Sequence, residues 1–460
     1  MKNSNNTLLG FLILILMNLG CEDNLELQPQ QSLSPEAVIT DAANLQNLLI
    51  GLYDEAANGS AETPTFEENI YGGVLTLAIE LLGNSGELSF NGTFEEPAEF
   101  NEKAILTGNV NTRDIWLNAY EVNNQANIIL ENLDVVDDLA TRNRMEGEAK
   151  FLRALVYFDL ARVFGLPYEA GQQNAQPAVP IVLGTVTDAS HVEFPSRNSV
   201  EEVYVQVIAD LTDAYDLLPD DNDVFADKYT AQALLALVYL QQGNFAGARD
   251  SAHDVIQNSG HMLAPDFASA FNNDGDSAED VFAWQITAQD GKNDMNTFWS
   301  GSEFGGRPGN PDVSINPVHF EIYDDTSDER NFFFYENSGG LATAKWQGEF
   351  SNIPFIRLAE MHLIRAESNF REGTAVGMTP ENEMNTLRER SGAQSLSGIT
   401  LQDILDERIR ELSFEGFRLH DIKRLEGMVG TLNYDNPKLI MPVPQRETDA
   451  NPNLEQNPTY

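Results

Sequence analysis

The sequence predicts a mainly α fold of tetratricopeptide-like helical repeats, an α-α superhelix, with a loop-rich, irregular part and a few short strands. Long segments carry apolar residues at the three- and four-residue spacing of an amphipathic helix. One stretch also has the residue spacing of a tetratricopeptide helix pair. Two long stretches between the helical segments are instead rich in turn-forming and aromatic residues. With 460 residues, 42% of them hydrophobic, the chain is long enough to bury a core.

The N-terminus has the pattern of a lipoprotein signal peptide. Residues 1–20 hold one lysine before an apolar run that is too short to span a bilayer of about 30 Å. Cys21, the only cysteine, stands where a lipoprotein signal peptidase would cut, which predicts a lipid anchor on its sulfur. The alternative is an ordinary secretory signal beside an incidental cysteine. After cleavage, we expect residues 21–34 to form a lipid-anchored tether and residues 35–460 to form a single domain.

The helical segments have recognisable ends. A helix with regular apolar spacing follows Ser199, which makes a capping box with Glu202, and Pro219 stops it. Thr400 is the expected cap of a second amphipathic helix over residues 401–412. These capping and stop residues predict the start of both helices and the end of the first.

The tetratricopeptide spacing L-[GA]-x2-Y-x3-G-x-[YF]-x2-A occurs at residues 235–248. Small residues there permit close helix crossing, and Gly243-Asn244 makes the turn between the paired helices. Residues 148–164 are apolar on nearly every side, which predicts a central, buried helix. Together with looser helix pairs, these segments predict a helical scaffold over about 35–82, 112–258 and 354–425.

Two turn-rich stretches, residues 83–101 and 264–350, interrupt the scaffold. The first combines Gly, Asn and Pro with three Phe, and the second contains a short alternating strand at residues 281–287. Loops this long in a compact protein are usually functional or disordered, and their aromatic content favours function. We therefore expect the ligand-binding loops in these two stretches.

The charge balance excludes several functions. Lys and Arg number 27 against 72 Asp and Glu, which gives a formal net charge of −45. Nucleic-acid binding needs clustered basic residues that neutralise phosphates, and an anionic membrane surface would repel the chain. We expect no nucleic-acid partner, and contact with a membrane only through the lipid anchor.

Catalytic and metal-binding motifs are missing from the sequence. None of the six histidines has H-E-x-x-H spacing, and there is no G-x-S-x-G, P-loop or G-x-G-x-x-G motif. With 72 acids, pairs of carboxylates at the distance a glycosidase needs arise by chance and discriminate nothing. Acylation of Cys21 would leave no thiol for catalysis or disulfides. We expect no enzyme activity, no metal site and no cofactor.

Motifs spread over most of the chain resemble those of the SusD/RagB family of outer-membrane lipoproteins. The N-terminal match is Cys21-Glu22-Asp23, and the C-terminal one is N-x-N-L-x-Q-N-P-x-Y, in which Thr459 replaces the family's Gly. Four further matches follow the family's order: W-x3-Y with A-N from Trp116 to Asn127, G-E-A-x-F-L-R-A from Gly147, R-L-A-E from Arg357, and E-R-x-x-E-L-x-x-E-G-x-R from Glu407 to Arg418.

The resemblance implies a body of tetratricopeptide units that supports a loop-rich ligand-binding part. It also implies a lipid-anchored position on the extracellular face of the outer membrane, over a SusC-like TonB-dependent transporter. We expect a non-catalytic lipoprotein that captures oligosaccharides for that transporter, with neutral glycans weakly favoured by the acidic charge. A peptide-binding RagB-like uptake lipoprotein is the alternative, and a secreted glycoside hydrolase is a more remote one.

Aromatic residues in the two loop stretches are the candidate glycan contacts, because sugar rings stack their C–H faces on aromatic side chains. Trp299 is the first candidate, since it lies in a segment rich in Gly, Asn and Ser; the alternative for Trp299 is a loop anchor. If Trp299 is a stacking platform, Trp299→Ala should weaken oligosaccharide binding and leave thermal unfolding nearly unchanged. Trp116, Trp284 and Trp346 are expected to be structural. The further candidates are Phe298, Phe304 and Arg307 near Trp299, and Tyr71, Phe90, Asn91 and Phe94 at the first stretch.

Residues 357–424 are dense in charge. Glu367 with Arg371, and Arg408 with Glu411, have the spacing of ion pairs on a helix surface. We interpret these charges as contacts that hold the fold and not as catalytic groups.

Overall fold

The computed structural model describes residues 39–58, 70–187, 193–289, 291–309, 311–337 and 339–460. The signal segment and Cys21 lie outside these residues, so the lipid anchor stays a prediction. The chain falls into two units, Met1–Thr40 and Asp41–Tyr460, and every element given below belongs to the second. None of the helices in the described ranges combines the length and the apolar character that a membrane crossing requires.

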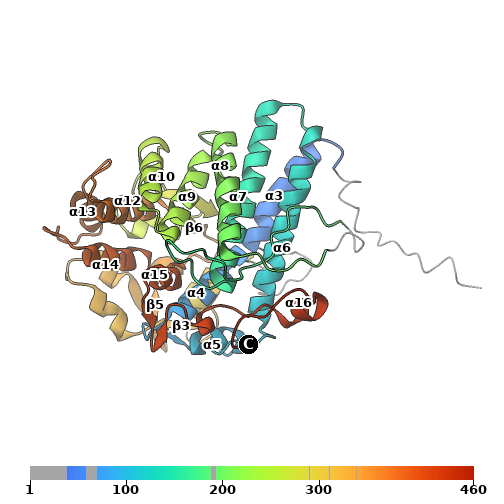
Figure 1. Cartoon of the computed structure of the whole chain (residues 1–460). Helices are drawn as coiled ribbons and strands as arrows, with labels where there is room; N and C mark the ends of the chain where they lie inside the picture. The colour runs from blue at the N-terminus through green and yellow to red at the C-terminus, as the bar shows by residue number, and fades with distance from the viewer. Residues whose placement is uncertain (1–38, 59–69, 188–192, 290, 310, 338) are drawn as a thin grey trace, which may run out of the picture. The chain divides into compact units, whose positions relative to one another are not determined.

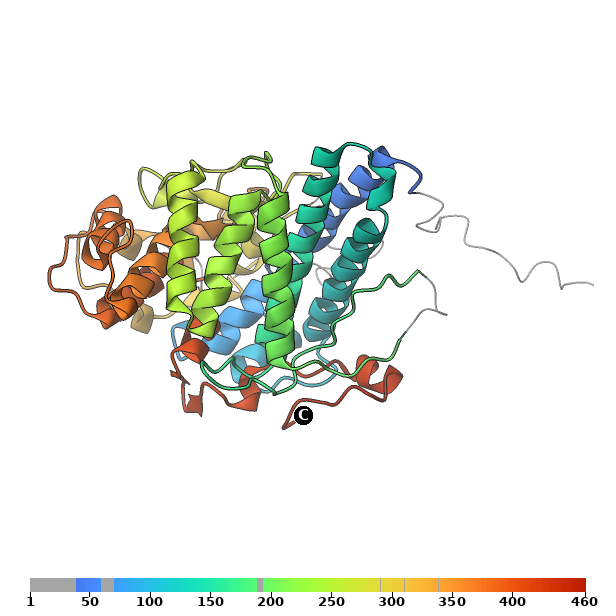
Figure 2. The same ribbon diagram turned by 45° about the horizontal axis from the view of Figure 1, so that its top comes forward.

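Long helices standing side by side form much of the Asp41–Tyr460 unit (Figures 1 and 2). Their bounds are Ala42–Asn58 (α3), Val110–Glu131 (α6), Leu139–Phe164 (α7), Val200–Leu217 (α8), Lys228–Gln242 (α9), Phe245–Asn258 (α10) and Leu358–Glu372 (α12). Helices α6, α7, α8, α9 and α10 each pack against the next in this order, and α10 packs against α12. The prediction of a mainly α fold built from packed helix pairs is confirmed.

Local sequence sets the helix ends where the predictions placed them. The Ser199 hydroxyl accepts the Glu202 N–H in a complete capping box, and α8 ends just before Pro219. Between α9 and α10, Gly243 closes the first helix at a φ of 72°, in the left-handed region that favours glycine. Asn244 then caps α10 by accepting the Gly247 N–H. The tetratricopeptide-like turn is therefore confirmed.

Helix α7 is buried over most of its length, which confirms the buried helix predicted for residues 148–164. The ring of Trp116, from α6, meets the ring of Phe164 edge-on at a centroid distance of 4.9 Å. Trp116, Trp284 and Trp346 are exposed by only 3%, 1% and 5%, respectively. The structural role expected for these three tryptophans is confirmed.

Shorter helices and strands occupy the segments between the long helices. The short helices are Leu75–Gly83 (α4), Glu95–Glu102 (α5), Asp294–Trp299 (α11), Pro380–Arg390 (α13), Leu401–Leu412 (α14), Arg418–Arg424 (α15) and Gln445–Ala450 (α16). The strands are Leu88–Phe90 (β1), Asp280–Trp284 (β2), Val313–Ile315 (β3), Phe334–Asn337 (β4), Gly340–Thr343 (β5), Ile353–Arg357 (β6), Met428–Val429 (β7) and Leu432–Asn433 (β8).

The strands of the described residues pair antiparallel, in the orders β1-β3-β5-β4, β2-β6 and β7-β8. The strand expected at residues 281–287 is β2, which ends earlier, at Trp284. The four-stranded sheet joins the two turn-rich stretches, because β1 belongs to the first and its partners belong to the second. These stretches thus contain short helices and strands where the sequence predicted mainly loop.

A buried ion-pair network lies where β6 meets α14. Arg357 Nη1 is 2.6 Å from Glu279 and 3.0 Å from Glu411, and Arg357 Nε is 2.8 Å from Glu415. All four side chains are less than 5% exposed. Removing one partner of such a network leaves a buried charge uncompensated, which typically costs about 3–5 kcal/mol. The interpretation of these charges as fold-holding contacts agrees with this geometry.

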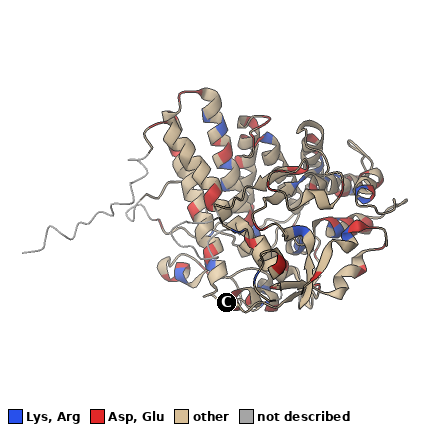
Figure 3. Cartoon of the chain, turned by 180° about the vertical axis from the view of Figure 1, so that it is seen from behind, with Lys and Arg blue, Asp and Glu red and all other residues tan. Residues whose placement is uncertain are grey.

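Of the two ion pairs predicted on helix surfaces, one forms, although its Glu367 is buried, and the other is wrong. Glu367 and Arg371 lie 2.8 Å apart, as expected. Arg408 does not pair with Glu411 but lies 2.8 Å from Asp421 of α15. Helix α14 packs between other elements, so Glu411 faces the Arg357 network while Arg408 faces α15. Figure 3 shows acidic and basic residues interleaved along the helical segments.

The C-terminal residues are tied to the helical body. The Asn457 side-chain amide donates to the carbonyls of Phe164, at 2.8 Å, and Met441, at 2.6 Å. Thr459 adopts a φ of 79°, which is a strained conformation for a β-branched residue. Glycine, which stands here in the family that the chain resembles, adopts such a φ without strain.

Candidate functional site

The four-stranded sheet brings the two turn-rich stretches together. Phe90 lies opposite Val313 in the β1–β3 pair. Directly after β1, the Asn91 N–H donates to the Asp312 carbonyl at 2.7 Å, and the Asn91 side-chain amide donates to Ser314 Oγ at 2.6 Å. These contacts place two predicted site residues, Phe90 and Asn91, beside the second stretch.

Arg307 lies between aromatic residues of both stretches. Its guanidinium carbon is 4.0 Å from the centre of the Phe94 ring and 5.7 Å from the centre of the Phe298 ring. Its Nη1 is 3.3 Å from Asp312 Oδ2. Phe94 is 43% exposed, and the Arg307 side chain is 20% exposed, so solvent reaches both. We call Phe94, Phe298, Arg307 and Asp312 the Arg307 platform.

The Arg307 platform is nearly neutral and presents a guanidinium over an aromatic ring. The charges of Arg307 and Asp312 offset each other, and burial raises the pKa of Asp312 although Arg307 acts in the opposite direction. A guanidinium stacked on a phenyl ring offers a planar surface with N–H donors along its edge. Such a surface suits a ring-shaped ligand that has C–H faces and hydroxyl groups.

Phe304 makes a second exposed aromatic contact in the same stretch. It is 38% exposed and meets the Tyr335 ring edge-on at a centroid distance of 4.9 Å. The Tyr335 hydroxyl accepts the Gly301 N–H at 2.9 Å. Sequence reasoning missed Tyr335, because it lies in a run of four aromatic residues in which only the β4–β5 pairing sets the direction of each side chain.

Trp299 is the last residue of α11 and is 0% exposed. Its ring packs against Phe414 at a centroid distance of 5.4 Å. A stacking platform has to present a ring face to the sugar, so the structure favours the loop-anchor alternative for Trp299. The expectation of an open loop needs correction, because these residues form a helix in which Asn293 accepts the Asn296 N–H.

Tyr71 also lies in the core, with 3% of its surface exposed. Its ring stacks on Trp284 at a centroid distance of 4.9 Å and an interplanar angle of 12°, and its hydroxyl donates to Asp159 at 2.9 Å. Burial, followed by the charge of Asp159, raises the pKa of Tyr71. Tyr71 is therefore a packing residue. Phe298 is also buried, with 5% exposed, but its ring lies beside the Arg307 guanidinium.

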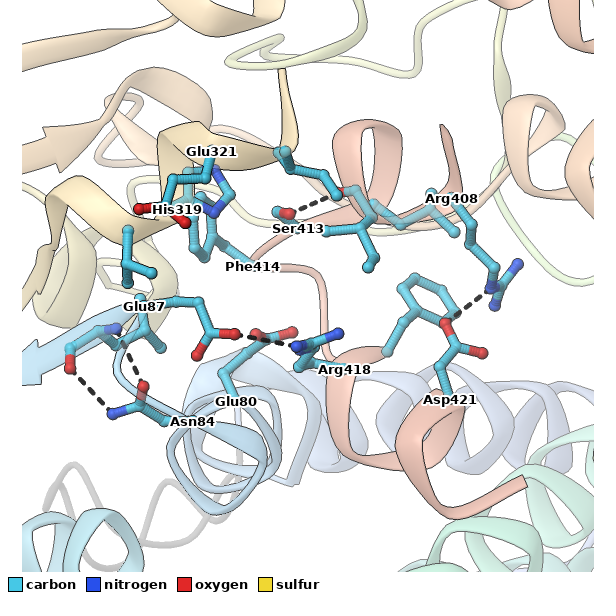
Figure 4. A pocket seen from close by; sticks show the side chains of 16 residues that line it. Glu80, Asn84, Glu87, His319, Glu321, Arg408, Ser413, Phe414, Arg418 and Asp421 are labelled. Atoms are coloured by element: carbon cyan, nitrogen blue, oxygen red, sulfur yellow. Dashed lines mark hydrogen bonds and ion pairs between the residues drawn. The ribbon is translucent and has the colours of Figure 1, made fainter. Parts of the chain in front are cut away.

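A cavity of about 260 Å³ opens elsewhere in the fold, between α4, β1, the 3₁₀ helix Pro317–Ile322 (η6), α14 and α15 (Figure 4). The ion pair of Arg418 with Glu87, at 2.9 Å, lies in the lower part of the view, and His319 and Phe414 lie in the upper part. None of the Arg307 platform residues lines this cavity. Sequence reasoning missed it because its walls come from distant parts of the chain.

Burial sets the charge of two groups in the cavity. It raises the pKa of Glu80 to about 7, although the N–H that Gly416 donates to Glu80, at 2.8 Å, and the charge of Arg418 act in the opposite direction. It also lowers the pKa of His319 to about 4, so the imidazole is neutral at pH 7.

The described residues contain no cluster of side chains that could bind a metal ion. No group of three or more His, Cys, Asp and Glu side chains there is placed to hold a metal ion. The most deeply buried carboxylates instead face arginines, as in the Arg357 network.

Two family models match the chain. The one described as "SusD family" matches residues 196–438, and the one described as "Starch-binding associating with outer membrane" matches residues 23–240.

Individual proteins are similar to the chain over different lengths. SusD-like protein P2 of Formosa agariphila is 28% identical over 98% of this chain and 99% of its own length. The starch-binding protein SusD of Bacteroides thetaiotaomicron is 32% identical over 26% of each chain. The crystal structure of a SusD superfamily protein from Bacteroides thetaiotaomicron has a TM-score of 0.77 and 24% identity, and the match covers 91% of this chain and 100% of that one. This last likeness shows a shared fold.

Proposed function

This chain belongs to the SusD family, and we propose that it is a non-catalytic cell-surface lipoprotein that captures oligosaccharides and delivers them to a SusC-like TonB-dependent outer-membrane transporter. In this proposal, Cys21 carries the lipid, residues 21–34 form the tether, and residues 35–460 form one binding domain on the extracellular face. The family model described as starch-binding and associating with the outer membrane supports both the ligand class and the location.

The Arg307 platform is the observation that carries the ligand assignment. Within the two stretches expected to bind ligand, it combines an exposed phenyl ring with a stacked guanidinium 4.0 Å away. This combination suits oligosaccharide binding, since the ring can pack against the C–H face of a sugar while the guanidinium edge donates to hydroxyls. Phe304 with Tyr335 would extend the contact to a neighbouring sugar.

The charges at the platform support a neutral glycan and argue against hydrolysis. Asp312 already offsets Arg307, so no uncompensated positive charge awaits a sulfate or a uronate. A glycosidase needs two carboxyl groups free to act on opposite sides of the scissile bond. Asp312 is instead engaged with Arg307, which suits binding without catalysis.

Replacing Phe94 with Ala should weaken oligosaccharide binding about tenfold, equivalent to about 1.4 kcal/mol, while thermal unfolding changes little because Phe94 is 43% exposed. Arg307→Lys should also weaken binding, since Lys keeps the charge but loses the planar stacking group. Protein lacking residues 1–21 can be run through gels that contain neutral or anionic polysaccharides, and calorimetry with derived oligosaccharides then gives the affinities.

Phe332→Ala is the matched control, because Phe332 is 67% exposed and is not part of the platform. It should retain the affinity of the unmodified protein. If Phe94→Ala and Arg307→Lys both bind as tightly as this control, the platform is not the glycan site. Preference for an anionic polysaccharide would contradict the neutral-ligand assignment.

Peptide binding remains the alternative function, and the same protein can distinguish it. Retardation by glycan gels with no capture from peptide pools supports the proposal, whereas the reverse result assigns a RagB-like peptide-binding role. Release of reducing ends from a polysaccharide by the purified chain would instead indicate the more remote hydrolase.

A further inference from the structure

A second, smaller cavity lies between α15 and the helices α7, α8 and α9. Its volume is about 20 Å³, and none of the Arg307 platform residues lines it. A cavity needs about 10–15 Å³ to hold one water molecule, so this cavity has room for a single water molecule or a monatomic ion. Sulfate, phosphate and carboxylate ions are too large for it.

The side chains that bring charge to the wall of this cavity are basic. They are Arg162, Lys423 and Arg424, and no carboxylate lines the cavity, although the chain has 72 Asp and Glu against 27 Lys and Arg. Two of the three are offset by acids behind the wall, because Arg162 pairs with Asp159 and Arg424 lies 2.7 Å from Glu367. Lys423 makes no ion pair within the described ranges. The charge left for a ligand is therefore positive, and Lys423 carries it.

The Lys423 ammonium also has donors to spare. Its side chain is 5% exposed, and its one acceptor among the described residues is the Arg162 carbonyl, 3.0 Å from Nζ, whereas an ammonium group has three donors. Burial lowers the pKa of Lys423 to about 7, and the charge of Arg162 acts in the same direction without an opposing carboxylate. A buried cation without a counter-ion is costly, and an anion in the cavity would offset that cost.

Two further donors open to the same cavity. Tyr204 and Gln241 are 3% and 8% exposed, and their side chains make no hydrogen bond to other described residues. Neither the Tyr204 hydroxyl nor the Gln241 amide is sealed off from a molecule the size of water, so both face the cavity that they line. His420 also lines it, but burial lowers the pKa of His420 well below its usual value, so the ring adds no charge. Donors from α8, α9 and α15 thus meet at one small space.

We propose that this cavity binds one chloride ion, at a site that is separate from the Arg307 platform and does not rest on the glycan proposal. Lys423 supplies the opposite charge, and the Tyr204 hydroxyl and the Gln241 amide donate to the ion. A monatomic anion fits both the volume and the surplus of donors. Because the ion joins α15 to α8 and α9, its binding stabilises the folded chain.

Two sodium salts at equal ionic strength test the ion. At pH 6, where Lys423 is mostly charged, chloride should raise the midpoint of thermal unfolding by about 1–2 °C more than gluconate, whose anion is too large for the cavity. The difference should shrink at pH 9, because a neutral amine does not attract an anion. Equal midpoints in the two salts at pH 6 would mean that the cavity holds only water, which would overturn the proposal.

Two variants locate the chloride effect. Lys423→Met keeps the length of the side chain without its charge, so the difference between the two salts should disappear. The control is Lys438→Met, which removes an exposed lysine outside the cavity and should keep the full difference. Tyr204→Phe keeps the ring that packs on Phe158 and removes one donor, so it should reduce the difference. A full difference in Lys423→Met would show that the ion binds elsewhere.

Bromide gives a direct test, because it scatters X-rays anomalously and resembles chloride. Crystals of the protein soaked in sodium bromide should show an anomalous peak beside Lys423 Nζ, and its absence would exclude the site even if Lys423→Met failed to fold. Oligosaccharide binding provides the separating readout. Lys423→Met should bind oligosaccharide as the unmodified chain does, and Phe94→Ala should keep the chloride effect, so failure of either proposal is distinguishable from failure of the other.

Discussion

At the residue scale, exposure separates the aromatic residues of the two turn-rich stretches into two groups. Phe94 and Phe304 are 43% and 38% exposed, whereas Trp299 is 0% exposed. All three stand in segments of similar composition, rich in Gly, Asn and Ser. The first two can meet a ligand as they stand, while Trp299 contributes packing against Phe414.

Trp299→Ala should therefore act on stability first. Removing a fully buried large aromatic side chain typically costs about 3–5 kcal/mol, because it leaves a cavity that neighbours fill only in part. Thermal unfolding followed by circular dichroism should show a clearly lower midpoint than for the unmodified chain, whereas Phe94→Ala should stay close to it. An unchanged midpoint together with lost glycan binding would instead restore Trp299 as the stacking platform.

At the element scale, the Arg307 platform depends on the pairing of β1 and β5 with β3. Gly340 begins β5, and a Cβ added there would lie 2.1 Å from Ser314 Oγ and 2.7 Å from Ser314 Cβ. The same Oγ accepts the hydrogen bond from Asn91 that fixes the chain after β1. The absence of a side chain at Gly340 thus permits the strand contact on which the platform rests.

Gly340→Ala should lower the free energy of unfolding by about 1–3 kcal/mol, as overpacking does, and should weaken glycan binding by displacing β3. Chemical denaturation and calorimetry measure the two effects. In a Ser314→Gly background, the methyl group that Gly340→Ala adds no longer clashes with the Ser314 side chain. The loss of unfolding free energy caused by Gly340→Ala should then largely disappear. Gly275→Ala is the control, since nothing lies within 4 Å of a Cβ at that position. Equal costs of Gly340→Ala in both backgrounds would contradict the steric account.

At the scale of the whole molecule, buried ionisable groups make stability depend on pH in opposing ways. Burial raises the pKa of Glu80 to about 7 and that of Asp280 to about 7, and it lowers the pKa values of His319 and His420. The carboxyls hold protons in the folded chain that the unfolded chain releases, so their contribution to stability falls as pH rises. The histidines act in the opposite sense, because the unfolded chain protonates them first.

Comparison with Glu80→Gln isolates one of these contributions. An unfolded glutamate ionises near pH ~4.3, so between that value and about 7 the folded chain binds the extra proton. The unmodified chain should therefore lose stability relative to Glu80→Gln as pH rises through this window, by up to about 4 kcal/mol. Denaturation at a series of pH values measures the difference, with exposed Glu95→Gln as the control. A difference that does not vary with pH would show that Glu80 titrates normally.

The sequence by itself determined the helical character of the body and the ends of individual helices. The cap at Ser199, the left-handed turn at Gly243 and the buried α7 all follow from residues within one or two turns of each other, so local spacing specifies them. Motifs also identified the family that the match over residues 196–438 shows. The candidate contacts Phe94 and Arg307 were found as members of two stretches, but nothing in the sequence indicated that they touch.

Only the tertiary structure decided which of those residues form a surface. The β1–β3 pair joins segments more than 200 residues apart, as in the contact of Asn91 with Ser314, and that register places Arg307 against Phe94. Packing against Phe414 buries Trp299, and the packing of α14 against its neighbours pairs Arg408 with Asp421 and not with Glu411. Helix ends depend on neighbours in sequence, so the sequence alone predicts them. Exposure and ion-pair partners depend on elements brought together from distant parts of the chain, so the sequence does not predict which candidate residues form a surface.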